Sequence, residues 1–172
     1  MKNFEFLQID PLSIKDNLIK LISADWMLVT AGNKEKINTM TANWGGAGYL
    51  WNRPVVFVFV RPERYTYQLT ERSEGFTLSF FNEEYRPALN ICGSKSGRDF
   101  DKIAEALLTP VFTELGYPAF KEAKLVIECR KLYSELLTKD AFIVREPVAA
   151  HYSGQAGIHK LYIAEIKKVW IK

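Results

Sequence analysis

The sequence of 172 residues fits one ordinary domain that is long enough to bury a full hydrophobic core. Hydrophobic residues make up 48%, which excludes a disordered chain, and no run approaches the roughly 18 apolar residues of a membrane-spanning helix. The formal net charge of +3 is too small for the dense basic face typical of nucleic-acid-binding proteins. The first residues contain no apolar run that resembles a signal peptide, so we expect a cytoplasmic protein without a membrane partner.

The cysteines and histidines do not predict a metal site. Cys92 and Cys129 are expected to be free thiols, because a cytoplasmic chain with a core of this size needs no disulfide. His151 and His159 have no zinc-type ligand spacing with these cysteines, so we expect no structural metal. Both histidines lie in a segment rich in Tyr and Gly, which favours loop residues, with a place at the mouth of a site as the alternative.

Taken in chain order, the predicted elements are mostly strands. A capping-box pattern at 13–16 precedes apolar residues at helical spacing and predicts a short amphipathic helix. Three glycines between 45 and 48 then interrupt the pattern. The strand signal at 55–60 is apolar on both faces and predicts a central strand. Further elements are expected as strands at 26–31, 37–42, 76–81, 124–133, 141–144 (paired with 124–133) and 160–171, and as helices at 64–72, 86–92 and 99–108.

The order of these elements favours one fold class. Strands do not alternate regularly with long helices, which disfavours a doubly wound parallel sheet. Closing an antiparallel sheet into a barrel removes its exposed edges. We therefore expect a single mostly β domain over residues 1–172, an antiparallel, Greek-key-like β-barrel with a few peripheral helices.

The first segment that could bind a ligand is the strand at 38–46, which runs into a glycine-rich bend. Small residues at a bend let backbone N–H and C=O groups approach a ligand closely. Thr41 and Asn43 add short polar side chains. Such an edge suits a flat heteroaromatic ring, although a plain strand followed by a glycine-rich loop is an equally good interpretation of the local sequence.

The second segment, at 61–67, follows the apolar strand and opens a helix. The free N–H groups of a helix N-terminus favour an anion, and the guanidinium groups of Arg61 and Arg64 match phosphate oxygens. Thr66 adds a hydroxyl in the first turn. A phosphate cradle is favoured over a solvated helix start, because Arg61 at the end of a buried strand needs a partner for its charge.

The third segment, at 92–102, combines glycines, hydroxyls and cations before a helix, which again suits an anion. It is not a Walker A loop, since Lys95 follows a serine, and a G-x-G-x-x-G fingerprint is absent elsewhere. ATP hydrolysis and a Rossmann dinucleotide site are therefore not supported. Basic neighbours would activate the Cys92 thiol, but an inert, half-buried cysteine near a helix end is the favoured interpretation.

These three segments, in this order, resemble the flavin reductase-like proteins of the flavoredoxin type. The resemblance covers about residues 20 to 170 and implies an FMN-binding split barrel that forms a homodimer, with FMN near the dimer interface. It implies that the flavin ring lies along Met40, Thr41, Ala42, Asn43 and Trp44. It also implies that the ribityl phosphate is held by Arg61, Arg64, Tyr65 and Thr66, and that the other side is closed by Lys95, Ser96 and Gly97.

The resemblance implies an oxidoreductase whose chemistry belongs to the cofactor. Flavin N5 accepts hydride, so no catalytic side chain is assigned and a recognisable acid–base pair is not expected. NADH or NADPH would be the transient electron donor, and the acceptor would be free flavin, ferric iron, a partner oxygenase or another electron carrier. Two alternatives stay open at this point: an FMN-binding electron carrier without NAD(P)H activity, and a barrel that stacks nucleobases instead of flavin.

Overall fold

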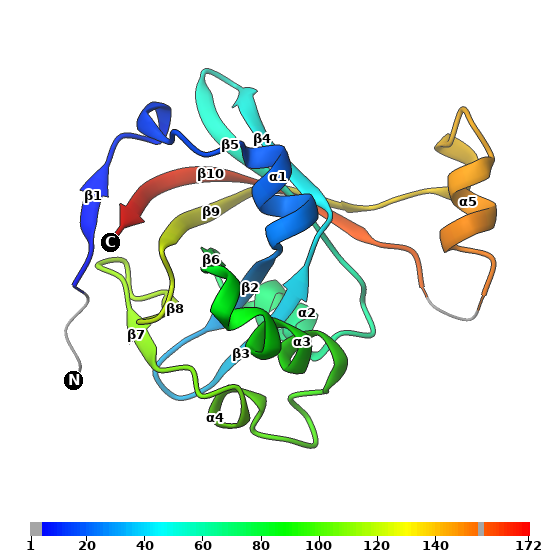
Figure 1. Cartoon of the computed structure of the whole chain (residues 1–172). Coiled ribbons are helices and arrows are strands. Elements are labelled where there is room, and N and C mark those ends of the chain that lie inside the picture. Colours follow the sequence, from blue (N-terminus) through cyan, green and yellow to red (C-terminus); the bar gives the residue numbers. More distant parts are fainter. Residues whose placement is uncertain (1–4, 155–156) are drawn as a thin grey trace.

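We describe the protein from a computed structural model, which describes residues 5–154 and 157–172. Figure 1 shows a strongly curved sheet with helices around it. The strands of the main sheet are β1 (Leu7–Ile9), β2 (Met27–Gly32), β3 (Ile37–Ala42), β4 (Gly45–Leu50), β5 (Arg53–Val60), β6 (Gly75–Phe80), β9 (Leu125–Leu136) and β10 (Lys160–Ile171). The helices are α1 (Leu18–Lys20), α2 (Tyr65–Arg72), α3 (Arg86–Ser94), α4 (Lys102–Glu105) and α5 (Glu146–His151), and a small second sheet pairs β7 (Pro110–Phe112) with β8 (Pro118–Phe120).

The main sheet is antiparallel throughout and runs in the order β3-β2-β6-β9-β10-β5-β4, with β1 added to β10. The long strands β9 and β10 pair with each other, and each also pairs with a strand of one half of the sheet. The two ends of the order, β3 and β4, are consecutive in the chain and separated only by Asn43 and Trp44. The sheet is therefore a barrel split at this bend, which confirms the predicted mostly β split barrel with few helices.

The core has two parts because several strands are buried on both faces. In β2, Met27 and Val29 belong to the cluster inside the curved sheet, whereas Leu28 between them packs against the residues under α3 and β8. All three side chains are fully buried. Side chains alternate across a strand, so this single strand joins the barrel interior to the outer layer that carries α3. The position of α3 over β3 matters for the site described below.

The bend at the split depends on one close backbone approach. A Cβ atom at Gly45 would lie 2.7 Å from the backbone oxygen of Phe57 on β5, so a side chain does not fit there. From Gly45 the chain continues as β4 and returns through a two-residue turn, Trp51–Asn52, in which both residues have positive φ. This geometry is the twist-matched hairpin turn that glycine and asparagine usually supply. The glycines between 45 and 48, which were expected to interrupt the pattern, therefore belong to strand β4.

Two further strand predictions need correction. The strand at 55–60 is not central: β5 is next to the edge strand β4, and Phe57 and Phe59 are only partly buried. The segment 141–144 is not a strand; the chain makes a helical turn at Lys139–Ala141, and Ile143 is fully exposed. The partners of β9 are β6 and β10 instead. Apolar, β-branched residues at 141–144 favour a strand locally, but a strand forms only where a neighbouring strand is free to pair with it.

The helix predictions hold in part. The helices expected at 64–72 and 86–92 are present as α2 and α3. The capping box at 13–16 is wrong: Asp10 accepts from the backbone N–H of Leu12, and Asn17 caps α1 by accepting from Lys20. The helix expected at 99–108 shrinks to the four residues of α4. In the described part of the chain, no helix is long and apolar enough to span a membrane.

The segment between β9 and β10 leaves the barrel. We call its described residues, 137–154 and 157–159, the arm. Figure 1 shows α5 of the arm standing away from the body of the molecule. The base of the arm returns to the start of β10, where His159 is buried beside the bend at the split.

Candidate functional site

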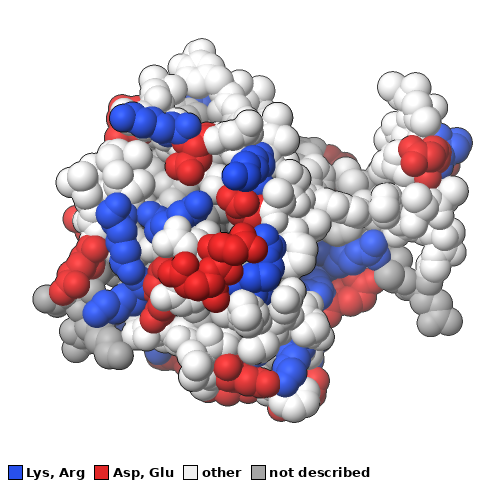
Figure 2. All heavy atoms as spheres, in the orientation of Figure 1, with Lys and Arg blue, Asp and Glu red and all other residues white. Residues whose placement is uncertain are grey.

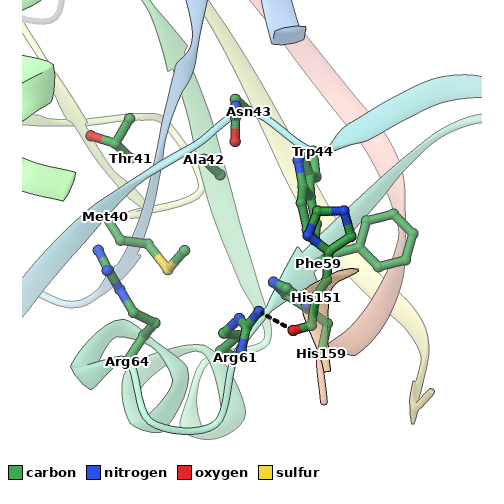
Figure 3. A pocket seen from close by; sticks show the side chains of 10 residues that line it. All are labelled: Met40, Thr41, Ala42, Asn43, Trp44, Phe59, Arg61, Arg64, His151 and His159. Atoms are coloured by element: carbon green, nitrogen blue, oxygen red, sulfur yellow. Dashed lines mark hydrogen bonds between the residues drawn. The ribbon is translucent and has the colours of Figure 1, made fainter. Parts of the chain in front are cut away.

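The bend between β3 and β4 forms one wall of a pocket of about 320 Å³. Figure 3 shows Met40 and Arg64 on one side of this pocket, Trp44 and Phe59 on the other, and Arg61 between them. Met40 and Ala42 are buried, and they form the floor of the pocket. The lining residues are Met40, Thr41, Ala42, Asn43, Trp44, Phe59, Arg61, Arg64, His151 and His159. Seven of the twelve binding residues predicted from the sequence are among them.

The two arginines of the pocket have different surroundings. Arg61 donates to the backbone oxygens of His151 at 3.0 Å and Gly157 at 3.1 Å, and its guanidinium lies 5.5 Å from the ring centre of Tyr152. Among the described residues, the guanidinium of Arg64 makes a single long hydrogen bond, 3.5 Å, to the backbone oxygen of Cys92. Arg61 therefore ties the base of the arm to the barrel, whereas the guanidinium of Arg64 is available to a ligand.

Arg64 is a half-buried cation without a carboxylate partner in the described part of the chain. Burial lowers the pKa of its guanidinium, and in the described residues no carboxylate lies within ion-pair distance of it. It occupies the N-cap position of α2, where the backbone N–H groups of the first turn favour negative charge. A half-buried cation beside a helix N-terminus, facing a pocket, is the arrangement that an anionic group would stabilise.

Tyr65 and Thr66, the first two residues of α2, do not line the pocket. The hydroxyl of Thr66 is fully buried and accepts a hydrogen bond from the Asn38 side chain at 2.8 Å, which fastens α2 to β3. The ring of Tyr65 lies between two cations, with the Lys36 ammonium 5.2 Å and the Arg98 guanidinium 5.1 Å from its centre. Their backbone N–H groups belong to the first turn of α2, and their side chains support the helix.

The loop after α3 packs against the start of α2 rather than into the pocket. A Cβ atom at Gly97 would lie 2.0 Å from Asn38 Oδ1 and 3.3 Å from the Tyr65 ring, so only glycine fits there without a shift. Arg98 donates to the backbone oxygen of Glu63 at 3.1 Å. Lys95 forms an ion pair with Glu105. The structure thus places Lys95, Ser96 and Gly97 beside the predicted phosphate cradle, while none of the three lines the pocket itself.

Trp44, which the sequence interpretation assigned to the ring site, packs against two histidines that were not among the assigned binding residues. The Trp44 ring centre lies 4.9 Å from that of His151 and 5.0 Å from that of His159. His159 is 8% exposed, and its Nδ1 lies 2.8 Å from the Tyr152 hydroxyl. Burial, with the charge of Arg61 as a second cause, lowers the pKa of His159 to about 4, so its imidazole is neutral at pH 7. Both histidines line the pocket, as the alternative of a place at a site mouth suggests, and His151 is the last residue of α5 rather than a loop residue.

Phe59 is the other pocket residue that the sequence interpretation missed. It belongs to β5, whose side chains alternate, so Phe59 faces the pocket while Val58 and Val60 are fully buried. The alternation was hidden because every residue of this strand after Arg53 is apolar. Only the change from aromatic to aliphatic residues distinguishes the two faces.

The surroundings of Cys92 favour an inert thiol over a redox thiol. It is fully buried in the layer under α3, and burial raises the pKa of its thiol to about 11 even though the Lys102 ammonium lowers it. The thiolate is the reactive form of cysteine, so this group is inert at neutral pH. Cys92 and Cys129 are both free and buried. Among the described residues, no group of three or more His, Cys, Asp or Glu side chains is placed to hold a metal ion.

The pocket therefore combines two aromatic walls and a buried apolar floor with polar side chains, and it includes the guanidinium of Arg64. The described residues that line it do not pair a nucleophile with a base. Together with the fold, this defines a class of proteins: split β-barrels with a pocket at the split.

Comparison with known proteins identifies the family. Residues 20–172 match the model of the flavin reductase-like domain, and the chain belongs to this family. Flavoredoxin of Desulfovibrio vulgaris (Miyazaki F) superposes with a TM-score of 0.66 at 25% identity, covering 86% of this chain and 69% of that one. The FMN-binding protein from Thermus thermophilus, with bound p-hydroxybenzaldehyde, gives a TM-score of 0.67 at 20% identity over 86% of this chain and 71% of its own.

A third structure, the NADH:FAD oxidoreductase SgcE6 of Streptomyces globisporus C-1027 in complex with NAD and FAD fragments, has a TM-score of 0.62. It is 19% identical, and the alignment covers 86% of this chain and 74% of that one. A search of curated proteins found no match to this chain. At these identities, the superpositions of the Thermus and Streptomyces proteins show only that the fold is shared. The match to the family model is what shows that the chain belongs to the family.

Proposed function

We propose that this protein binds FMN in the pocket at the split and acts as an NAD(P)H-dependent flavin reductase. The observation that carries the proposal is the pocket itself: a slot walled by Trp44 and Phe59 that ends at the unpaired guanidinium of Arg64. A flavin mononucleotide has the matching parts, a flat ring system and a phosphate. Membership of the flavin reductase-like family and the flavin-binding neighbours support the same assignment.

The ring would lie along Met40, Thr41, Ala42, Asn43 and Trp44, where the buried floor and the backbone of the bend are closest to the pocket. Arg64 and the backbone N–H groups of Tyr65 and Thr66 would hold the phosphate. Arg61 would act mainly through the arm, whose backbone oxygens it binds, and Lys95, Ser96 and Gly97 would support the start of α2. The flavin supplies hydride acceptance at N5 when bound, so the side chains need only bind, orient and exclude water.

The electron donor is the finer part of the proposal. NADH or NADPH would transiently occupy the open face of the pocket next to Trp44, which is 38% exposed. The Streptomyces neighbour, described as an NADH:FAD oxidoreductase, supports a pyridine nucleotide donor, whereas the flavoredoxin neighbours suit an electron carrier. Steady-state oxidation of NADH and NADPH with added FMN separates the two. Turnover above the rate of free flavin supports a reductase, and a flavin-loaded protein without turnover leaves only the carrier.

We also propose that the protein is a homodimer and that the arm packs on the second copy. The arm carries Ile143, which is 100% exposed, and Val144, which is 63% exposed, so neither side chain is part of the core. Figure 2 shows charges of both signs scattered over the body and a mostly uncharged arm on the same face. Exposed apolar residues on a projecting segment of a flavin reductase-like chain are suited to a subunit interface.

The dimer proposal is tested by light scattering of the wild-type protein and of Ile143→Asp. We expect a dimer for the wild type and a shift to monomer for Ile143→Asp, because a carboxylate in an apolar interface loses its hydration. Glu146→Asp, a change at an exposed residue of the same arm, serves as the control and should stay dimeric. A wild-type monomer at all concentrations would remove the proposal.

A further inference from the structure

Lys102, the first residue of α4, is a buried cation that the proposed function does not use. Its side chain is 3% exposed, and its ammonium donates to the backbone oxygens of Cys92 and Lys95, each at 3.1 Å. In the described part of the chain no carboxylate lies within ion-pair distance of it. Lysine is rarely buried without a charged partner, so this position needs an explanation.

The two oxygens that Lys102 binds lie at the C-terminal end of α3. The last carbonyl groups of a helix have no intrahelical partner and carry partial negative charge, so the ammonium satisfies them. The same end of α3 lies on the flavin site: a Cβ atom at Gly93 would be 3.2 Å from the Thr41 side chain, and the Thr41 hydroxyl donates to the Leu89 oxygen. Lys102 thus fixes a helix end that touches the wall of the pocket.

The Cys92 oxygen is shared between Lys102 and Arg64. Arg64 donates to it at 3.5 Å, and this is the contact that orients its guanidinium at the pocket. The oxygen therefore joins a buried ammonium to the arginine that faces the ligand. If the helix end moved, the position of Arg64 would change with it.

The charges around this oxygen are unbalanced. Burial, with repulsion by the nearby Arg64 guanidinium as a second cause, lowers the pKa of Lys102 to about 8. The Cys92 thiol is neutral at pH 7, and Glu105 is paired with Lys95. Glu35, Asp99 and Asp101 line the same pocket as Lys102, together with the cations Lys36 and Arg98, but none of these carboxylates is within ion-pair distance of the Lys102 ammonium. Two cations with one neutral acceptor between them are stabilised when an anion binds next to them.

We propose that Lys102 is a positioning residue for phosphate recognition, which holds the Cys92 carbonyl so that Arg64 faces the pocket and adds its buried charge to the attraction for the FMN phosphate. This inference rests on the proposed function. It distinguishes Lys102 from an ordinary helix cap, because a cap would stabilise the fold without favouring FMN over riboflavin, which has the same ring and no phosphate.

The test measures the dissociation constants of FMN and riboflavin for the wild type and for Lys102→Met and Lys102→Gln. Methionine keeps the apolar length of the side chain without the charge, and glutamine keeps an N–H donor for the α3 carbonyls. Lys121→Met, at an exposed lysine, is the matched control. For both Lys102 variants we expect FMN binding to weaken about 5- to 30-fold, the range of a partly screened charge interaction, with riboflavin within about twofold of wild type.

The wild type gives a second readout that needs no substitution. The preference for FMN over riboflavin should fall as the pH rises from about 7 to about 9, where an ammonium with a lowered pKa loses its proton, and Lys102→Met should lack this dependence. Equal losses for the two flavins, or a flat wild-type profile, would overturn the inference while leaving the proposed function intact. A wild type that binds neither flavin refutes the proposed function itself, and the inference with it.

Discussion

Replacement of Arg64 by alanine tests the assignment of the phosphate position. In the protein alone the guanidinium makes one hydrogen bond of 3.5 Å, so its removal should cost less than about 1 kcal/mol of folding free energy. With FMN bound, a charge-assisted contact to phosphate contributes roughly 1.5–3 kcal/mol. FMN binding should therefore weaken about 10- to 150-fold, because each 1.4 kcal/mol is about tenfold, whereas riboflavin binding should change little.

In the assay, each purified variant is titrated with FMN and with riboflavin, and binding is monitored by the quenching of flavin fluorescence. Arg53→Ala is a matched control, because Arg53 pairs with Glu165 at 3.6 Å on the surface of the β4–β5 hairpin. Arg61→Ala should weaken both flavins to a similar extent, since this guanidinium binds the backbone of the arm. If Arg64→Ala weakened FMN and riboflavin equally, the phosphate would not lie where we place it.

Two further predictions concern the supports of the site. Gly97→Ala places a Cβ atom 2.0 Å from Asn38 Oδ1 and should break the bond between Asn38 and Thr66, which costs about 1–3 kcal/mol in urea unfolding. Gly154→Ala, with nothing within 4 Å of the new atom, should be neutral, and an equal cost at both positions would contradict this reasoning. His159 has a folded pKa of about 4 against 6.5 for the ordinary group, so the unfolded chain binds the extra proton between these values. The free energy of unfolding should therefore fall as the pH drops from about 6.5 to about 4. In thermal unfolding across that range, this fall should be about 1–3 kcal/mol smaller for His159→Gln than for the wild type. An unchanged slope in the variant would mean that the imidazole is protonated in the folded protein.

The sequence predicted strands correctly where the pattern of apolar residues indicates burial directly. The segments at 26–31, 37–42 and 160–171 alternate or fill with apolar β-branched residues, and each is a strand in the structure. Strand β4 was missed because its glycines carry no side-chain pattern, and because its turn places Trp51, a residue that seldom adopts positive φ, where glycine is usual. Ile143 and Val144 led to the opposite error, a predicted strand that is absent. An apolar side chain gives the same signal in a sequence whether it faces the core or the solvent.

The candidate site was predictable in its chemistry and not in its contacts. The sequence indicates cations at a helix start after an apolar strand, and the structure places Arg64 at that position facing a pocket. It does not indicate that Arg61 binds the backbone of a segment about ninety residues away. The same holds for His151 and His159, which reach Trp44 only because the arm folds back to the start of β10. Contacts of this range depend on the sheet order, which local patterns do not encode.

The most direct test of the account is the absorption spectrum of the purified protein, with chromatographic identification of any ligand released by heat. We expect a yellow protein that releases FMN, or an apoprotein that becomes yellow and stays so after gel filtration with added FMN. A colourless protein that does not retain added FMN would contradict the central claim, and salt-dependent oligonucleotide binding by that protein would favour the nucleobase-stacking alternative.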